Sequence, residues 1–203
     1  MDYKTGRVAG VNGNLVKVIF DETVIKNEVG YILVGDEKLK GEVIRITGGV
    51  ADLQIYEDTS GIKVGDSVKF TGELLSVELG PGLLTQVFDG LQNPLPSLAE
   101  KCGFFLQRGV YLDPIPNKEW EFTPSVKAGD AVVAGDTIGT VQELLFQHKI
   151  MVPFTLPGEW KVDSIVEKGV YHAKDTVAVI SNDKGEKKEL SMIITQPVKV
   201  PIK

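Results

Sequence analysis

Val11-Asn12-Gly13-Asn14 is a strong hairpin signal, and it is followed by the strand-like run Leu15-Val16-Lys17-Val18-Ile19-Phe20. An Asn-Gly pair tolerates the positive φ angles that a tight hairpin turn requires. The six residues after it are rich in β-branched side chains, which favour extended strands. The stretch therefore predicts a β-hairpin whose turn lies within residues 11–14.

Strand-like segments continue on the C-terminal side of this hairpin. Tight turns such as Gly48-Gly49 separate them, and they show no helical period. The candidates are Val29 to Val34, Gly41 to Thr47, Ala51 to Tyr56 and a closing strand to which Gly61 to Val68 leads. Five or six short strands within about 70 residues predict a small closed barrel, because closure removes the exposed edges of a small sheet.

The character of the sequence changes between Thr71 and Gly109. Glu78 to Gly82 is a turn cluster. Leu91 to Cys102 is the best helix candidate, and its prolines fall near the helix start, where proline is tolerated. This segment is predicted to be a connector that packs on another element.

A second β-rich block runs from about Val110 to Asn182. It contains a near-repeat: Val126-Lys127-Ala128-Gly129-Asp130 is echoed by Val132-Val133-Ala134-Gly135-Asp136, with Gly-Asp at a turn in each copy. Residues 181–188 are expected to form a charged turn and residues 190–195 a final strand. The predicted fold class is mainly β, with a small N-terminal barrel, a connector with a short helix and a second, barrel-sandwich-like domain.

The composition limits the function classes. The 203 residues carry a formal net charge of −6, which argues against nucleic-acid binding, because a binder needs a basic face to neutralise phosphates. Cys102 is the only cysteine, so an internal disulfide is impossible and a reducing compartment is expected. The sequence has no signal region and no run near the roughly 20 apolar residues of a spanning helix. A cytoplasmic protein that meets a membrane only through partners is therefore predicted.

No catalytic, cofactor-binding or metal-binding residue is predicted in this chain. The string G-x-x-x-x-G-K-[ST] of a phosphate-binding loop is missing, and Gly80-Pro81-Gly82 is interpreted as a turn. His148 and His172 are too few for a zinc site, and Cys102 is expected to be a small hydrophobe, with a Cys–His nucleophile as the alternative. The adjacent acids Glu57-Asp58 are interpreted as part of a solvated turn.

The Gly-Asp near-repeat is similar to the hammerhead fold of biotinyl and lipoyl carrier domains, which display a modifiable lysine at a hairpin tip. Lys149 lies roughly where that lysine falls, but the Met-Lys-Met and Asp-Lys-Ala patterns of carriers are missing around it. The preceding stretch, Glu143-Leu144-Leu145-Phe146, is too apolar for an exposed tip. The same architecture without the prosthetic group is expected, with a carrier domain as an alternative.

Three groups of strings stand out along the chain. The first group is Leu39 to Ile46 with Gln54 to Gly61. The second group is Leu75 to Leu84, which runs into Phe88 to Leu95. The third group consists of Trp120 to Phe122, the Gly-Asp repeat, Gly139 to Glu143 and Ile150 to Pro153. Together they resemble the N-terminal part of the catalytic A subunit, or alpha chain, of vacuolar/archaeal-type (V/A-type) rotary ATPases. The resemblance covers essentially the whole chain in order, and the second group is the most specific.

The third group points to the A subunit, because F-type catalytic subunits and non-catalytic B subunits lack this insertion. Two departures concern individual side chains: Asn93 stands where the family has arginine, and Gln196-Pro197-Val198-Lys199 replaces Trp-Pro-Val-Arg. The resemblance implies four parts. They are a barrel at 1–72, a connector at 73–109 that belongs to a nucleotide-binding domain, an insertion at 110–185 and a return strand at 186–203.

The resemblance also implies a function for the whole protein. That protein would couple ATP hydrolysis or synthesis to H⁺ or Na⁺ transport by rotation, with Mg-ATP bound by a P-loop beyond Lys203, so the chain is expected to be a fragment. The barrel would join three A and three B subunits in a ring, with central and peripheral stalk subunits as further partners and only indirect contact with the membrane. The insertion would project outward. A stand-alone β adaptor is the alternative.

The two β modules are expected to fold separately, with the connector loosely held between them. Its apolar side chains are expected to pack on the nucleotide-binding domain, and unpacked apolar surface favours mobility. These residues are Leu83, Leu84, Phe88, Leu91, Phe104 and Phe105.

Overall fold

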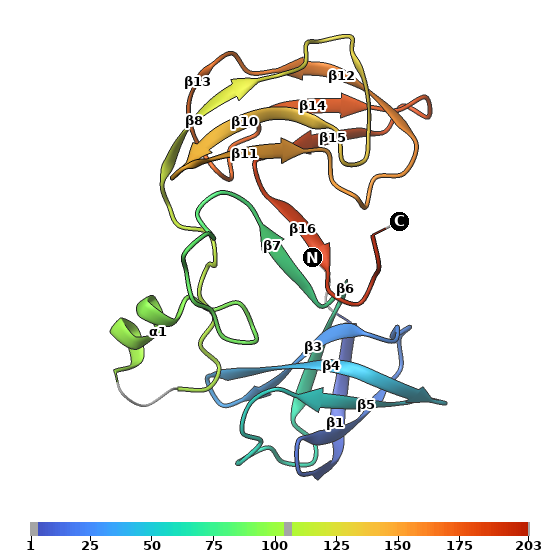
Figure 1. Ribbon diagram of the computed structural model, residues 1–203. Helices are drawn as coiled ribbons and strands as arrows, with labels where there is room; N and C mark the ends of the chain where they lie inside the picture. Colours follow the sequence, from blue (N-terminus) through green and yellow to red (C-terminus); the bar gives the residue numbers. More distant parts are fainter. Residues whose placement is uncertain (1–3, 104–106, 203) are drawn as a thin grey trace. The chain divides into compact units, whose positions relative to one another are not determined.

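The computed structural model describes residues 4–103 and 107–202 of the chain, and Figure 1 shows the order of their strands and helix. The fold of this described part is mainly β with one short helix, as predicted. The chain forms two compact units. No helix of the described residues is long and apolar enough to cross a membrane.

Among the described residues of the first unit, six strands close into a barrel in the order β1-β2-β5-β4-β3-β6 (Figure 1). The strands are β1 (Lys4–Asn12), β2 (Leu15–Phe20), β3 (Glu28–Val34), β4 (Glu37–Thr47), β5 (Val50–Ile55) and β6 (Ser67–Leu74). Every neighbouring pair is antiparallel, and β1 closes the ring on β6. The predicted barrel and its first hairpin are confirmed: Asn12 pairs with Leu15, and Gly13 begins the turn with a φ of 60°.

Alternate residues of these strands point inward and form the barrel core. Val16 and Val18 on β2 are fully buried, whereas Lys17 between them is exposed. Phe70 is also fully buried, because glycines leave room for its ring. A Cβ at Gly6 would lie 3.0 Å from the Phe70 ring, tighter than an ordinary contact. Glycine at position 6 therefore leaves the space that the Phe70 ring occupies.

The chain leaves the barrel through elements that the sequence places in a connector. β7 (Ser76–Leu79) pairs with β16 (Ile194–Pro197) in a two-stranded sheet, and α1 (Leu95–Cys102) follows β7 in the chain. Contacts group residues 76–97 with the second unit and residues 98–111 with the first. The predicted connector, 73–109, is thus divided between the two units. Phe104 and Phe105 lie outside the described residues.

The helix begins four residues later than the sequence suggested. The Asp89 carboxylate accepts hydrogen bonds from the backbone N–H groups of Leu91 at 2.9 Å and Asn93 at 2.8 Å. This turn competes with helix formation, as aspartate side chains often do, and Gln92 takes a φ of 65° that no α-helix contains. The helix therefore starts only after Pro94.

The second unit contains two four-stranded sheets that share one core (Figure 1). One sheet has the order β11-β10-β8-β13, with β8 (Glu119–Pro124), β10 (Thr137–Glu143), β11 (Phe146–Met151) and β13 (Gly169–His172). The other has the order β15-β14-β12-β9, with β9 (Ala131–Val133), β12 (Glu159–Ile165), β14 (Ala178–Ser181) and β15 (Lys187–Leu190). Both sheets supply buried side chains, for example Phe122 and Trp160, so the second β-rich domain of the prediction is confirmed.

β15 changes the expected layout of the C-terminal part. The sequence placed residues 186–203 in a return strand and residues 190–195 in one strand. Instead Ser181 pairs with Lys187 and Ala178 with Leu190, so β15 completes a sheet of the second unit. The chain then continues to β16, and the charged turn lies between Ser181 and Lys187. The return segment thus begins after Leu190.

The Gly-Asp near-repeat marks a turn that the chain uses more than once. The Asp130 carboxylate accepts a 2.8 Å hydrogen bond from the backbone N–H of Lys127, and Asp136 accepts one of the same length from Val133. Asp66 forms the same bond with the N–H of Lys63 in the barrel. The glycine before each aspartate has a φ between 87° and 98°, which explains the pair as a local turn signal.

Glu28 is the acid that the barrel buries most completely. Its side chain is fully buried at the start of β3, and neither carboxylate oxygen accepts a well-formed hydrogen bond from the described residues. Burial raises the pKa of this carboxyl group; nearby backbone groups of Ile25 and Gly72 and the Lys4 charge offset the rise only in part. The charged form is therefore disfavoured in the folded barrel.

We expect Glu28→Gln to stabilise the barrel at neutral pH, on the order of 1 kcal/mol, because the amide carries no charge to desolvate. The pKa of Glu28 is higher in the folded than in the unfolded chain. Its contribution to folding stability is therefore fully present below the unfolded-state pKa and is lost as the pH rises through the folded-state pKa. The gain should therefore shrink as the pH falls toward 4. Thermal unfolding across pH 4–8, with the exposed Glu22→Gln as control, measures it. Equal gains at all pH values would contradict the prediction.

Candidate functional site

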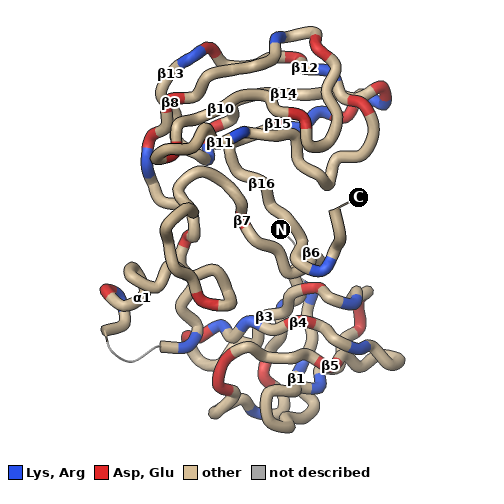
Figure 2. Tube along the Cα trace, viewed as in Figure 1, with Lys and Arg blue, Asp and Glu red and all other residues tan. Residues whose placement is uncertain are grey.

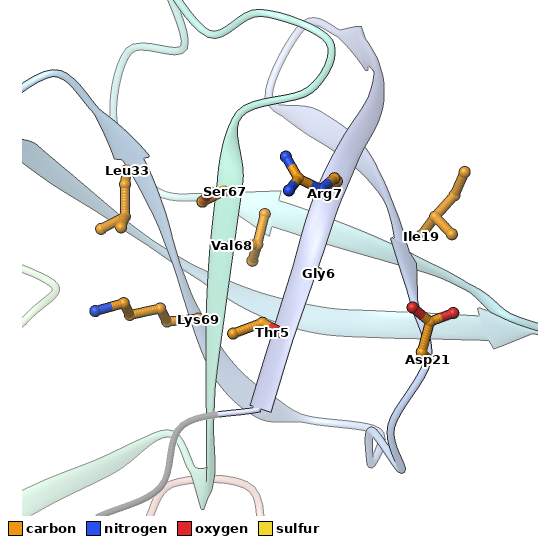
Figure 3. A pocket seen from close by; sticks show the side chains of 9 residues that line it. All are labelled: Thr5, Gly6, Arg7, Ile19, Asp21, Leu33, Ser67, Val68 and Lys69. Carbon is orange, nitrogen blue, oxygen red and sulfur yellow. The ribbon is translucent and has the colours of Figure 1, made fainter.

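A groove crosses the outer face of the barrel over β2, β1, β6 and β3 (Figure 3). Arg7 lies opposite Ile19 on one side and Ser67 on the other, and Thr5 lies opposite Lys69. The short side chains of Thr5 and Ser67 leave a hollow of about 440 Å³. Its lining consists of Thr5, Gly6, Arg7, Ile19, Asp21, Leu33, Ser67, Val68 and Lys69.

The groove joins an uncompensated cation to exposed apolar surface. The Arg7 guanidinium makes one long hydrogen bond, 3.4 Å to the Gly65 carbonyl, and forms no ion pair with any described residue. Ile19 beside it is 53% exposed. Arg and aliphatic side chains that stand unpaired at a surface are typical of protein contacts. The described lining holds neither a nucleophile–base pair nor a group of metal ligands.

A polar cluster fixes residues 108–111 to the barrel. Glu57 accepts hydrogen bonds of 2.6 Å from the Gly109 backbone N–H and from the Tyr111 hydroxyl. Burial, then the hydrogen bond to Glu57, raises the pKa of Tyr111 above its ordinary range. Arg108 adds an ion pair to Glu37 at 2.7 Å. The interpretation of Glu57 as a solvated turn residue is therefore wrong, because two of its partners, Gly109 and Tyr111, lie more than 50 residues away in sequence.

Asp58, the neighbouring acid, does behave as a turn residue. Its carboxylate accepts a 3.0 Å hydrogen bond from the Ser60 backbone N–H and a 2.8 Å bond from the Ser60 hydroxyl. These hydrogen bonds lower the pKa of Asp58. The side chain is exposed, so this acid needs no function beyond its loop.

A second anchored site lies in the second unit, at the loop Gly80-Pro81-Gly82. Glu143 at the end of β10 is 3% exposed, and its Oε1 accepts a 2.6 Å hydrogen bond from the Gly82 backbone N–H. Its Oε2 lies 2.6 Å from Nδ1 of the half-buried His148. Gly82 has a φ of 103°, and a Cβ there would come within 2.4 Å of Pro116. The loop is a turn, as predicted, and its Gly82 N–H also holds the β10–β11 hairpin through the hydrogen bond to Glu143.

The remaining candidate residues stay apart from any cluster. His172 is exposed, with Nε2 3.8 Å from a Glu119 carboxylate oxygen. Cys102 is a partly exposed free thiol at the end of α1. Within the described ranges, no group of three or more His, Cys, Asp or Glu side chains is arranged to hold a metal ion.

The carrier hypothesis placed Lys149 at a hairpin tip, and the structure contradicts this placement. Lys149 pairs with Thr140 inside the β10–β11 ladder. The register pairs Glu143 with Phe146, so Leu144 and Leu145 form the turn. The expectation that this stretch is too apolar for an exposed tip is wrong: Leu144 is 64% and Leu145 93% exposed. Strand register, which the hydrophobic pattern did not reveal, decided the position.

Comparisons with known proteins match both units. Residues 8–72 match the β-barrel domain of the ATP synthase alpha/beta family, and residues 113–199 match the barrel-sandwich domain of ATP synthase alpha/beta subunits. The V-type ATP synthase alpha chain of Treponema denticola is 54% identical over 195 residues, which are 96% of this chain and 33% of that protein. The alpha chain of Borreliella afzelii is 52% identical over 97% of this chain, and alpha chain 1 of Treponema pallidum 51% over all of it; each is covered to 34%. The chain thus spans about a third of the length of these curated relatives.

We expect Glu143→Ala to destabilise the second unit by about 2–3 kcal/mol, because it leaves the Gly82 N–H and the His148 ring without their buried acceptor. Denaturant unfolding measures the loss, and hydrogen exchange should show faster exchange of the Gly82 amide. Glu121→Ala is the matched control, since this acid pairs with Lys168 on the surface with both side chains more than 60% exposed. Unchanged exchange at Gly82 would show that Glu143 does not hold the loop.

Proposed function

Because the chain belongs to the ATP synthase alpha/beta family, we propose that it forms the N-terminal third of the catalytic alpha-type (A) subunit of a V-type rotary ATPase. The whole protein couples ATP hydrolysis or synthesis to H⁺ or Na⁺ transport across a membrane. The observation that carries this proposal is identity of 51–54% to V-type alpha chains along the entire barrel and insertion. This identity extends through the insertion, which by resemblance distinguishes A subunits from B subunits.

In this proposal the 203 residues assemble the machine, and other parts of the protein react with the nucleotide. Phosphoryl transfer from Mg-ATP needs a phosphate-binding loop, a lysine and a ligand for the metal ion. The described residues bring together no such set, and we assign a role in assembly to the groove around Arg7. Mg-ATP is therefore assigned to the part of the protein beyond this chain. The assembled complex is placed on the cytoplasmic side, peripheral to the membrane.

The groove is proposed to receive the barrel of a neighbouring B subunit in a ring of three A and three B subunits. Its unpaired Arg7 and its exposed Ile19 suit a partner surface that offers a carboxylate next to an apolar side chain. The insertion is assigned to the outside of the assembled head, where stalk subunits attach. Acidic and basic residues are interspersed along its chain (Figure 2), and exposed ion pairs such as Lys168–Glu121 suit reversible polar contacts.

The 203-residue chain is expected to bind no Mg-ATP, because each phosphate-contacting group is assigned beyond it. Isothermal calorimetry with Mg-ATP should give no heat of binding up to millimolar concentrations. The full-length protein is the positive control in the same buffer. Micromolar affinity of the 203-residue chain, free of contaminating ATPase, would refute this assignment.

Arg7→Glu in the full-length protein is expected to weaken assembly with B subunits at least tenfold, about 1.4 kcal/mol. The new carboxylate would repel the carboxylate that the partner surface is proposed to offer. Lys26→Glu makes the same charge change at an exposed loop position and should leave assembly unchanged. Native mass spectrometry of titrated subunits measures the ring population. If both variants assemble as the wild type does, the groove is not the ring contact. If the wild type itself forms no ring with ATPase activity, the proposed function fails.

A further inference from the structure

The tip of the β10–β11 hairpin is built from residues that a tight turn and a water-exposed surface both disfavour. Two-residue hairpin turns normally place Gly, Asn or Asp where the backbone needs a positive φ angle, and a turn with a positive φ at its first central residue alone favours Gly there. Here the two turn residues are leucines, and Leu144 has a φ of 52°. Leu144, Leu145 and Phe146 are 64%, 93% and 63% exposed. The sequence therefore bears both a conformational and a hydration cost at this position.

The hairpin holds this apolar tip in a fixed place. Glu143 below it is anchored to Gly82 and His148 by the 2.6 Å contacts described above. The Gln142 side chain donates a 3.0 Å hydrogen bond to the Leu144 carbonyl, which locks the turn itself. An apolar surface that is preorganised in this way loses little conformational entropy when it binds.

An apolar hollow of about 200 Å³ lies beside the hairpin in the same unit. Leu84 and Leu79 on its rim are each 43% exposed, and Ile194 of β16 is part of its wall. β11 supplies His148, Lys149, Ile150 and Met151 to the lining, so the strand that follows the tip also forms the hollow. The projecting tip and the hollow thus make one largely apolar docking surface.

We propose that a segment of the same polypeptide C-terminal to residue 203 covers this surface in the full-length protein. The inference rests on the proposed function, in which this chain is the first third of a longer subunit. Its curated relatives are about three times as long, and β16, which borders the hollow, leads the chain toward that missing part. A lipid surface fits poorly, because the tip has no basic residues and the chain has a net charge of −6.

Cysteine labelling tests what covers the tip. Leu145→Cys in a Cys102→Ser background is labelled with maleimide, and mass spectrometry reads the rate at the tip peptide. In the 203-residue chain the thiol should react as an exposed cysteine does. In the isolated full-length protein it should react at least tenfold more slowly. Equal rates in both would overturn the proposal, and so would protection that arises only with B or stalk subunits, which would identify a partner as the occupant.

A turn replacement provides a second test with opposite signs. Leu144→Gly with Leu145→Asn installs a favoured hairpin turn for this backbone, in which only the first central residue has a positive φ, and removes the apolar tip, so it should raise the Tm of the 203-residue chain by about 2–4 °C. In the full-length protein the same change should lower the Tm. Val170→Thr, at an exposed strand position of 61%, should change neither. A rise in both proteins would overturn the proposal. Both tests use isolated chains, so they are readable even if the ring with B subunits never forms.

Discussion

Burying a carboxylate without a partner costs free energy, and the pairing of buried carboxylates ties distant parts of the chain together. Glu143 joins the end of β10 to the Gly82 loop, 61 residues earlier. Glu57 holds Gly109 and Tyr111 on the barrel across more than 50 residues. Glu42, 2% exposed, accepts a 2.7 Å bond from the Tyr56 hydroxyl and binds Lys199, 157 residues away in the chain. In water such pairs contribute little, but burial makes the loss of either partner costly.

These acids explain why segments outside the strand ladders have defined positions. The loop at Gly80-Pro81-Gly82 and residues 108–111 form no part of either large sheet or of the barrel, and each is fixed by a carboxylate from a strand or from the end of one. Two anchors of this kind therefore lie in or next to the predicted connector, one at Gly82 and one at Gly109. Glu28 is the exception, since its carboxylate has no well-formed partner among the described residues. It is accordingly the acid for which neutralisation favours the fold.

The sequence predicted those features whose cause is local. Asn12-Gly13 and the Gly-Asp pairs act through backbone angles and short side-chain bonds, so the hairpin, the turns and the barrel followed from neighbouring residues. The start of α1 was missed because the Asp89 turn competes with the helix. The role of Glu57 was missed because its partners are remote. Neither failure concerns composition; each depends on a contact that hydrophobic periodicity does not contain.

The hairpin tip was missed for a more instructive reason. Apolar residues were taken to be buried, yet the register that pairs Glu143 with Phe146 forces the two leucines between them into the turn. Apolar character alone therefore does not decide burial when the ladder on both sides is fixed. A sequence that keeps leucine at a positive φ, where glycine would fold more easily, indicates a demand from outside the fold.

The two surfaces of this chain differ in chemistry, and the difference suits different kinds of contact. The barrel groove presents the Arg7 guanidinium, which forms no ion pair with a described residue, so a partner there would bind with charge-dependent specificity and could be exchanged. The tip presents uncharged apolar side chains on a rigid base, which suits a contact that forms once and remains buried. A protein that exchanges one contact while it keeps another permanently needs both kinds of surface.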